Sequence, residues 1–385
     1  MKPIYEFVAE RYQRELEIHP KAQTLYDVPG TYEALSEAWL TAVLCRDVPN
    51  AKVTGFRVAD RSDGSSNRGR LHVSYNEAGT KAGLPATVFC KASVTPKNRV
   101  LLAGSSGARV ETAFFQHMRR LVDIETPVPI HAAFDPWTHG YMVVMEDLGA
   151  TAHFCNDKTA ISRQHAERIV NTLAKLHARF HECKELGGPQ IPLLTWPQYF
   201  DDVNAANPGF AEACDKGFSL AEEVIPPRLF KRQREIWPLT DASVRRHDSL
   251  PKTVVHCDVH LGNWYIAGNG DLGLTDWQCV SIGHWSRDLA YALSTTLAVE
   301  DRRAWFDDLL RLYLDKMAQY GVKGLNFDEA MLNVRQQLMT TLAWWTITLN
   351  PAPGMPAMQP PAITFELIRR IAAAMDDMDA LDAFK

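Results

Sequence analysis

The chain has 385 residues, of which 46% are hydrophobic and 23% charged, a composition typical of a globular protein with a sizeable core. Its formal net charge of -5 excludes a general electrostatic attraction to nucleic acid or to an anionic membrane. The N-terminal sequence lacks the pattern of a secretory signal, no apolar run approaches the ~20 residues of a membrane span, and the seven cysteines form no Cys-x-x-Cys pair. We therefore expect a cytoplasmic protein with reduced thiols that binds neither nucleic acid nor membrane.

Hydrophobic periodicity indicates a β-rich first part of the chain. The first 30 residues show no clear pattern, and helical spacing begins at Thr31 and continues to Cys45. Short β-rich runs separated by Gly, Ser, Asn and Pro then fill residues 53–144. One helix, over residues 108–122, is expected to interrupt them.

Helices dominate the second part of the chain. The clearest pattern covers residues 161–183, where apolar residues recur at helical spacing, and helical patterns return from Asp328 onward. Residues 187–251 are richer in Pro and Trp and lack long periodicity. The sequence therefore predicts an α+β fold of two lobes. Residues 1–145 form a β-rich lobe with an N-terminal helical segment, and residues 146–385 form a larger, mainly helical lobe.

Three polar residues in the second lobe give the sharpest chemical signal. They lie in VVHCDVHLGNWYIAGNGDLGLTDWQ, residues 254–278, as Asp258, Asn263 and Asp276. A hairpin-like break, AGNG, separates Asn263 from the short alternating run that ends at Asp276. Asp258 and Asn263 then share one loop and Asp276 ends a nearby strand, so all three side chains can converge.

Phosphoryl transfer needs such a set of side chains. Its catalysis depends mainly on positioning and on electrostatic stabilisation of the transferred group. Mg²⁺ prefers hard oxygen ligands, which Asn263 and Asp276 offer, and a second carboxylate must accept the proton of the attacking hydroxyl. Asp258 suits that second role. Turn-forming residues are the ordinary alternative for all three.

The spacing His-x-Asp-x-x-x-x-Asn followed by a strand-borne Asp matches a kinase catalytic loop. The variant HxDxHxGN, then DWQ, then RDLAY, resembles the aminoglycoside phosphotransferase and choline kinase superfamily. More narrowly, it resembles the phosphotransferase group that includes ecdysteroid-kinase-like proteins, over residues 35–300. The resemblance implies a bilobal protein-kinase-like fold, a first lobe that binds ATP, and a second lobe that holds Mg²⁺, the catalytic loop and a small-molecule hydroxyl acceptor.

Two upstream residues match further positions of this family. Lys91 closes the strand-like run ATVFCK and resembles the strand lysine that contacts the ATP phosphates. Glu111 lies twenty residues later on the expected helix and resembles the glutamate that pairs with that lysine. Each residue alone would be an ordinary solvated charge. The resemblance therefore implies a Lys91–Glu111 ion pair in the nucleotide site.

The resemblance also implies a phosphate loop and a hinge. The loop SDGSSNRGR lacks GxGxxG, but hydroxyl and backbone N–H groups of Ser65, Ser66 and Asn67 could meet phosphate oxygens. The run MVVMEDLGA resembles the hinge between the lobes, whose backbone near Glu146 and Leu148 would bond the adenine edge.

Three further polar residues are interpreted as support for the catalytic loop. His256 is interpreted as structural, while His260 is open between support and contact with substrate or phosphate. Asp288, in SRDLAY, resembles the aspartate that braces the loop from the start of a helix. Asp288 follows Asp276 by only twelve positions, which leaves no room for a long activation segment and disfavours a protein substrate.

The acceptor and the oligomeric state are not fixed by the sequence. In this superfamily the acceptor site belongs to the helical lobe, which here is rich in aromatic side chains: Trp196, Tyr199, Phe200, Trp237, Trp285, Trp344 and Trp345. Acids are few, the pair Asp201 and Asp202 apart, so a fairly hydrophobic or aromatic alcohol is favoured over a polycationic aminoglycoside. A choline-type ammonium in an aromatic cage remains an alternative. For most of these rings, however, packing in the hydrophobic core is the expected role.

Two hypotheses from other functional classes also remain open. A metal-dependent hydrolase could use His256, Asp258 and His260 as metal ligands, although no further spaced His and Asp residues follow them. A catalytically silent nucleotide-binding module would keep ATP binding without turnover, but the presence of Lys91 and of the three polar loop residues argues against it.

Overall fold

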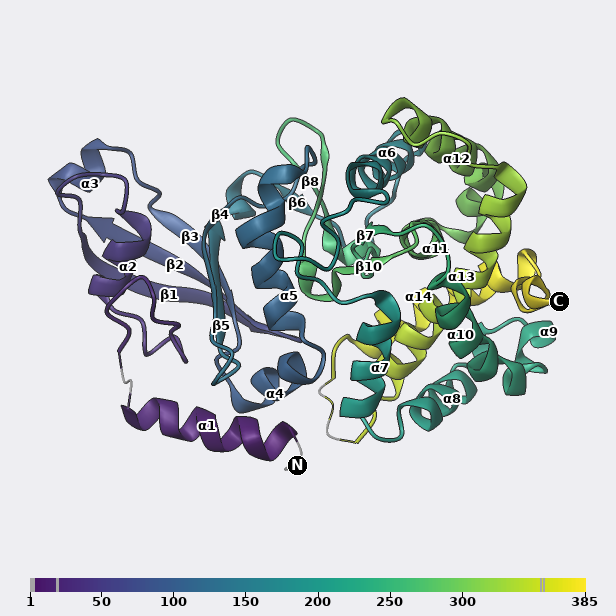
Figure 1. The fold of residues 1–385 in the computed structure, drawn as a ribbon, viewed down its shortest axis with the longest axis horizontal. Helices are drawn as coiled ribbons and strands as arrows, with labels where there is room; N and C mark the ends of the chain where they lie inside the picture. Colours follow the sequence, from purple (N-terminus) through teal and green to yellow (C-terminus); the bar gives the residue numbers. More distant parts are fainter. Residues whose placement is uncertain (1–3, 19–20, 354, 356) are drawn as a thin grey trace. The chain divides into compact units, whose positions relative to one another are not determined.

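The computed structural model describes residues 4–18, 21–353, 355 and 357–385, which form two compact units (Figure 1). The first unit comprises the described residues up to Arg119 together with residues 127–151, and the second comprises residues 120–126 and 152–385. The first is built around a β-sheet and the second is larger and mainly helical. The α+β fold is thus confirmed. The domain boundary after residue 145 stays a prediction. A few residues of the two predicted domains lie outside the described residues, namely 1–3, 19, 20, 354 and 356.

A five-stranded antiparallel sheet forms the centre of the first unit, in the order β1-β2-β3-β5-β4. Its strands are β1 (Val53–Asp63), β2 (Asn67–Tyr75), β3 (Thr87–Ala92), β4 (Pro129–Phe134) and β5 (Tyr141–Glu146). Strand β3 lies in the middle of the sheet, and Val88, Cys90 and Ala92 are fully buried on one of its faces. Because side chains alternate along a strand, Lys91 points to the other face.

Helices cover both faces of this sheet. Helix α2 (Glu37–Leu44) begins at Ser36, whose hydroxyl accepts a hydrogen bond from the Trp39 backbone at 3.0 Å. Its apolar residues pack with Leu71, Val88, Cys90 and their neighbours into one core cluster. Helix α5 (Gly107–Ala113) faces the Lys91 side, because its Glu111 pairs with Lys91.

The remaining helices of the first unit include an N-terminal one that is tied down by a buried ion pair. Glu15 of α1 pairs with Arg99 of α4, and Arg99 also donates to the Gly30 carbonyl at 2.9 Å. The other helical segments are α1 (Ile4–Ile18), α3 (Glu77–Lys81), α4 (Pro96–Gly104), a π-helical turn Phe114–Met118 and short 3₁₀ turns at Arg119–Leu121 and Leu148–Ala150.

The second unit contains two small antiparallel ladders, β6-β8-β9 and β10-β7. The strands are β6 (His153–Phe154), β7 (Thr253–Val255), β8 (Trp264–Ile266), β9 (Leu272–Leu274) and β10 (Ser281–Gly283). Strands β8 and β9 pair across the AGNG turn, as the sequence predicts. The predicted catalytic loop lies between β7 of one ladder and β8 of the other, so the two ladders anchor its two ends.

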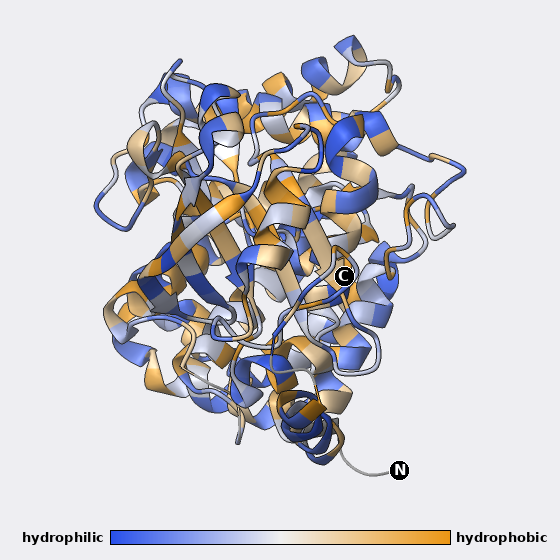
Figure 2. Cartoon of the chain, turned by 90° about the vertical axis from the view of Figure 1, so that its left-hand side faces the viewer, coloured by the Kyte–Doolittle hydropathy of each residue, from blue (hydrophilic) through white to orange (hydrophobic). Residues whose placement is uncertain are grey.

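Helices pack around these ladders, with α13 at their centre in contact with α8, α10, α11 and α14. The helices are α6 (Arg163–Phe180), α7 (Trp196–Ala206), α8 (Phe210–Leu220), α9 (Pro227–Phe230), α10 (Gln233–His247), α11 (Ser286–Thr295), α12 (Val299–Gln319), α13 (Phe327–Leu349) and α14 (Pro361–Asp377). Short 3₁₀ turns lie at Glu222–Val224, Leu261–Asn263, Trp277–Cys279 and Ala380–Phe384. Figure 2 shows hydrophilic and hydrophobic residues mixed along the helices, and within the described ranges none is long and apolar enough to cross a membrane.

The predicted elements differ from the observed ones in three places. The helix expected from Thr31 begins only at Glu37, because Ser36 supplies the N-cap. The helix expected over residues 108–122 is α5 followed by π and 3₁₀ turns, and α4 was not predicted. Residues 187–251 contain four helices, which lacked a long periodic signal because most are short and α10 contains Pro238.

Close packing of α8 against α13 gives a test of this fold. A Cβ atom at Gly217 would lie 2.1 Å from the Thr346 carbonyl oxygen, so Gly217→Ala must push the two helices apart. We expect it to lower the free energy of unfolding by about 1–3 kcal/mol, as overpacked cores do. Urea denaturation should show this against Lys216→Ala, an exposed change in the same helix. Equal midpoints for the two variants would contradict the packing.

Candidate active site

The predicted catalytic loop runs from His256 to Asn263 and joins β7 to β8. Cys257, in its first turn, has φ 67°, a left-handed conformation that is unfavourable for a residue with a side chain. Such a conformation persists only where the surroundings hold it. The carboxylate that holds it here comes from α11.

Asp288 in the first turn of α11 binds the loop through two backbone N–H groups. Its two oxygens accept hydrogen bonds from the His256 nitrogen at 2.6 Å and the Cys257 nitrogen at 2.8 Å. The His177 ring, held by the Tyr313 hydroxyl at 2.7 Å, lies 3.1 Å from the same carboxylate. Although burial raises the pKa of Asp288, the bonds from His177 and the His256 nitrogen outweigh it, and the pKa lies below its usual range. Asp288 is therefore ionised and accepts two backbone N–H groups of the loop, while its supporting role stays a prediction.

His256 connects the loop to the segment that carries Asp276. Its Nε2 lies 2.9 Å from the Thr275 carbonyl oxygen, and its Nδ1 accepts from the Asp258 backbone at 3.2 Å. This pairing places the ring proton on Nε2, and burial lowers the pKa of His256, so the ring is neutral. The Trp277 ring packs edge-on against it at 4.6 Å. His256 thus connects the loop to the Thr275 backbone, while its supporting role stays a prediction.

The structure brings Asp258 and Asn263 into direct contact. The Asn263 amide nitrogen donates to the Asp258 carboxylate at 3.0 Å and to the Asp258 carbonyl at 2.7 Å. The Asn263 carbonyl oxygen accepts from the Thr275 backbone at 2.8 Å, one residue before Asp276. Asp276 itself has φ 65°, so a left-handed turn sets the direction of its side chain. One hydrogen-bonded chain therefore connects the segments of all three polar residues.

Tyr291 completes the surroundings of Asp258 and was missed in the sequence analysis. Its hydroxyl donates to the other Asp258 oxygen at 2.9 Å. Burial, aided by the Asp258 carboxylate, raises the pKa of Tyr291 well above its usual range, so the hydroxyl keeps its proton. The signal was present, because Tyr291 follows Asp288 by three residues and so lies on the same helix face. The Asp258 side chain is still 23% exposed, which leaves it open to a substrate.

His260 lies beside this group without a direct hydrogen bond to it. Its Nδ1 accepts from the Gly262 backbone at 3.1 Å, and its Nε2 is 3.8 Å from the Asp258 carboxylate. The Trp345 ring stands perpendicular to it at 5.3 Å. The His260 ring is thus fixed next to Asp258, and both interpretations of its role stay open.

An aromatic cluster borders the catalytic loop. Cys257 and Val255 belong to the same core cluster as Trp196, Tyr199, Phe200 and Phe210, against which Trp237 and Trp344 pack half-buried. The Tyr199 hydroxyl lies 3.3 Å from the Cys279 sulfur, three residues beyond Asp276. The neighbouring acid Asp201 is bonded to Arg245 at 2.5 and 2.9 Å. The predicted aromatic region is therefore mostly core, with half-buried rings at its edge.

In the first unit, Lys91 and Glu111 form a buried ion pair. The Lys91 ammonium lies 2.7 Å from one Glu111 oxygen, with the side chains 7% and 1% exposed. The Tyr141 hydroxyl donates to the other oxygen at 3.2 Å. Separating a buried ion pair leaves each charge buried without a counter-charge, which is strongly unfavourable. The pair therefore fixes the Lys91 side chain at the centre of the sheet.

The predicted phosphate loop is the short turn between β1 and β2. Asn98 of α4 holds it by donating to the Gly64 carbonyl at 2.6 Å and the Ser65 carbonyl at 3.0 Å. Asn67 begins β2, and its side chain donates to Asp63 at 2.7 Å and accepts from the Val94 backbone at 2.8 Å. Ser66 and Asn67 are buried. The Asn67 side chain therefore positions the turn.

The predicted hinge residues lie where β5 ends. The Glu146 carboxylate accepts from the Val128 backbone at 2.8 Å and so ties β5 to the segment before β4. Leu148 begins a 3₁₀ turn capped by Asp147, which also bonds Arg70 at 2.6 Å. The Glu146 side chain is thus engaged within the sheet.

Comparisons with known proteins identify the family of the chain. The sequence profile of the phosphotransferase enzyme family matches residues 104–322, and the chain belongs to this family. No curated protein matches the sequence significantly. One similar solved structure is a Ralstonia eutropha JMP134 protein classed with the aminoglycoside phosphotransferases, which is 14% identical in sequence. The alignment covers 90% of this chain and 97% of the Ralstonia chain, with a TM-score of 0.50.

Two other solved structures resemble the chain more distantly. A Plasmodium vivax ethanolamine kinase is 11% identical over 97% of this chain and 95% of its own, with a TM-score of 0.49. A spectinomycin phosphotransferase, solved with ADP and spectinomycin, is 12% identical over 89% and 97%, with a TM-score of 0.46.

The family match confirms the superfamily predicted from the sequence. It also confirms the enzyme class: the protein is a phosphotransferase of the small-molecule kinase kind. The roles of individual residues stay predictions.

The brace from Asp288 can be tested by a change of one atom. Asp288→Asn replaces an acceptor oxygen by an NH₂ group that faces a backbone N–H or the His177 ring. We expect a loss of about 2–4 kcal/mol in the free energy of unfolding, because buried donors are left without an acceptor. Denaturant titration would measure the loss against Asp315→Asn, a matched change at an exposed position of α12. If both variants unfold at the same midpoint, Asp288 does not hold the loop.

Proposed function

We propose that the protein transfers the γ-phosphoryl group of ATP, with Mg²⁺, to a hydroxyl of a small and fairly hydrophobic or aromatic alcohol. The observation that carries this proposal is the geometry around Asp258. Tyr291 and Asn263 each donate to one carboxylate oxygen, at 2.9 and 3.0 Å, and the carboxylate remains partly exposed. A fixed, accessible carboxylate next to an amide is what a hydroxyl acceptor and a metal require.

Asp258 serves as the group that receives the acceptor hydroxyl. Two hydrogen bonds fix its orientation, so an incoming hydroxyl meets a carboxylate that needs no rearrangement. As the hydroxyl oxygen attacks phosphorus, Asp258 accepts its proton. His256, bonded through both ring nitrogens, keeps the loop in place and takes no proton itself.

Asn263 and Asp276 fit a magnesium site. The Asn263 amide nitrogen is used by Asp258, which leaves the amide oxygen as the end that can bind a metal. Together with the Asp276 carboxylate this gives hard oxygen ligands of the kind Mg²⁺ prefers. When bound, Mg·ATP supplies the phosphoryl group and the charge that neutralises it.

The first unit supplies the nucleotide contacts in this proposal. Lys91, oriented by Glu111, offers a positive charge to phosphate oxygens. Ser65 and Ser66 offer backbone and hydroxyl donors in a turn that Asn67 and its neighbours hold in shape. The backbone near Glu146 and Leu148 is assigned to the adenine edge, since the Glu146 carboxylate is already bonded to Val128.

The aromatic cluster favours an apolar acceptor over a polycation. Half-buried Trp237 and Trp344 lie in the cluster that also contains Cys257, the residue before Asp258. Asp201 is already neutralised by Arg245, so this acid is not available for ammonium groups. An aminoglycoside or choline-type acceptor is the alternative, supported only by distant resemblance in fold.

A metal-dependent hydrolase fits the geometry less well. Such a site would need His256, Asp258 and His260 as ligands. Both nitrogens of His256 are bonded to the backbone, and the Nδ1 atom of His260 accepts from Gly262. Among the described residues, no group of three or more His, Cys, Asp or Glu side chains is arranged to hold a metal ion.

An acceptor screen would test the proposed reaction. ATP consumption should be followed over alcohols, phenols, amino sugars and choline analogues, with mass spectrometry of each product. We expect phosphate transfer to one or more hydrophobic or aromatic alcohols. Turnover on amino sugars or choline alone would favour the alternative acceptors. Stabilisation by Mg·ATP without any turnover would favour a silent binding module.

Replacing Asp258 with Ala tests the role of the carboxylate. The variant should lose about 10²- to 10⁴-fold or more in kcat, because the hydroxyl loses its proton acceptor and its orientation. ATP affinity should change little, which calorimetry can check. Near-normal turnover on a true acceptor would show that Asp258 is not the base.

Asp276→Ala tests the metal site. We expect Mg²⁺ to stop strengthening nucleotide binding, since one of two proposed ligands is removed. Titration of ATP with and without Mg²⁺ measures the effect, and Asp271→Ala, an exposed change in the β8–β9 turn, is the control. Undiminished Mg·ATP affinity would contradict the assignment.

A further inference from the structure

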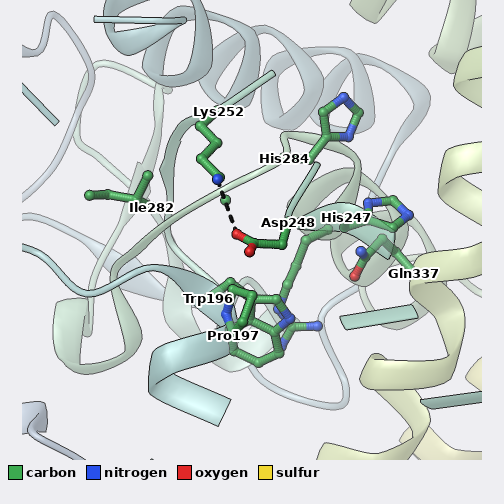
Figure 3. A pocket seen from close by; sticks show the side chains of 10 residues that line it. Trp196, Pro197, His247, Asp248, Lys252, Ile282, His284 and Gln337 are labelled. Carbon is green, nitrogen blue, oxygen red and sulfur yellow. Dashed lines mark ion pairs between the residues drawn. The ribbon is translucent and has the colours of Figure 1, made fainter. Parts of the chain in front are cut away.

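A small pocket in the second unit lies apart from the residues proposed for catalysis. It is formed where α7, β10 and α11 begin or end, beside α13 and the end of α10 (Figure 3). Its walls are Trp196, Pro197, His247, Asp248, Lys252, Ile282, Gly283, His284, Arg287 and Gln337. The pocket has room for a species about the size of one water molecule.

Arg287 brings a buried positive charge to this pocket. Its side chain is 1% exposed and donates to the Thr340 hydroxyl at 2.6 Å and the Cys257 carbonyl at 3.3 Å, both uncharged. No carboxylate among the described residues lies within ion-pair distance of it. The Trp196 ring, 3.7 Å from the guanidinium, offers a cation–π contact. A buried charge without a counter-charge is costly, so a small anion would stabilise Arg287.

Several hydrogen-bond donors in the pocket also have no acceptor. The Arg287 Nε and Trp196 Nε1 atoms are fully buried and make no hydrogen bond among the described residues. The Gln337 amide oxygen accepts from Thr340 at 3.0 Å, which leaves its NH₂ group as the end that can donate. Arg287, Trp196 and Gln337, which carry these donors, all line the same pocket.

The formal charge of the lining favours one negative charge. Arg287 and Lys252 are positive and Asp248 is negative, which leaves a net charge of +1 with the imidazoles neutral. Burial lowers the pKa of His247 to about 3 and that of His284 well below its usual range, so both rings are neutral near pH 7. Lys252 and Asp248 pair at 3.0 Å (Figure 3), and both side chains are partly exposed, so solvent reaches this part of the pocket.

We propose that this pocket binds a small monovalent anion, and that chloride is its occupant. Chloride is a compact monatomic anion, accepts several N–H donors at once, and would neutralise the net charge of the lining. Larger oxyanions exceed the available space. The proposal does not depend on the phosphoryl-transfer reaction.

An anion in this pocket would also act on the catalytic loop. Arg287 donates to the carbonyl of Cys257, the residue with the left-handed conformation immediately before Asp258. It lies one position before Asp288, which accepts from the backbone N–H of the same residue, Cys257. By fixing Arg287, chloride would stabilise the loop and the protein together.

Thermal unfolding of the whole chain provides the first test. Sodium chloride and sodium gluconate are compared at the same ionic strength, so that general screening cancels. Because the stabilisation grows with the logarithm of the chloride concentration above Kd, we expect Tm to keep rising without a plateau, by about 2 °C at ten times Kd. Identical curves in the two salts would overturn the proposal and leave a water molecule as the occupant.

Three charge changes sharpen this test. Asp248→Asn removes the negative charge at the mouth and should lower the Kd for chloride at least about threefold, while Lys252→Met should raise it by a similar factor. Lys175→Met breaks a comparable ion pair with Asp123, 2.9 Å long, and is the control. If all three variants respond to chloride alike, the effect does not come from this pocket.

Bromide diffraction gives a readout that needs no variant. Crystals of the wild-type protein soaked in sodium bromide should show an anomalous peak among Arg287, Trp196 and Gln337. Arg287→Met should lose both the peak and the chloride dependence of Tm. If Arg287→Met does not fold, the wild-type peak still decides, and its absence would contradict the proposal.

Discussion

The Asp288 carboxylate is the constraint on which the candidate active site depends. It accepts two consecutive backbone N–H groups at the start of the catalytic loop, and these bonds hold Cys257 in a conformation that a non-glycine residue otherwise avoids. That turn sets the position of Asp258. Because Asp288 lies in the first turn of α11, the loop geometry is anchored to a helix that is almost completely buried. The same helix supplies Tyr291 to Asp258, so one rigid element fixes both the loop backbone that precedes the proposed base and the side chain of that base.

The two units handle buried charge in different ways. In the first, Lys91 and Glu111 neutralise each other, and Tyr141 bonds the remaining carboxylate oxygen. In the second, the Asp288 carboxylate is stabilised by hydrogen bonds from His177 and from two backbone N–H groups. Arg287 lacks such a partner. This asymmetry, and not the shape of the pocket alone, distinguishes the chloride site from an ordinary packing defect.

The sequence predicts contacts between residues that are close along the chain better than contacts between distant residues. Asp258 and Asn263 share one loop, and their contact follows from a spacing of five residues. The pairing of Lys91 with Glu111 is what the resemblance to the family implies, and the two side chains are in contact. The contact of Tyr291 with Asp258 spans 33 residues and depends on how α11 packs, so the spacing of three from Asp288 places Tyr291 on the right helix face but does not name its partner. The helices of residues 187–251 were missed since short helices interrupted by Pro give little periodicity.

The side chains of the aromatic cluster differ in role: buried rings support the site, and only half-buried rings can contact an acceptor. Trp196 stacks on Arg287, belongs to the cluster with Cys257, and contributes an unpaired N–H to the small pocket. Its ring is 2% exposed, so it supports the site and does not itself meet the acceptor. Only the half-buried rings at the edge, Trp237 and Trp344, remain as surfaces for a substrate. Most of the aromatic signal in the sequence is therefore structural, and the choice of acceptor depends on few side chains.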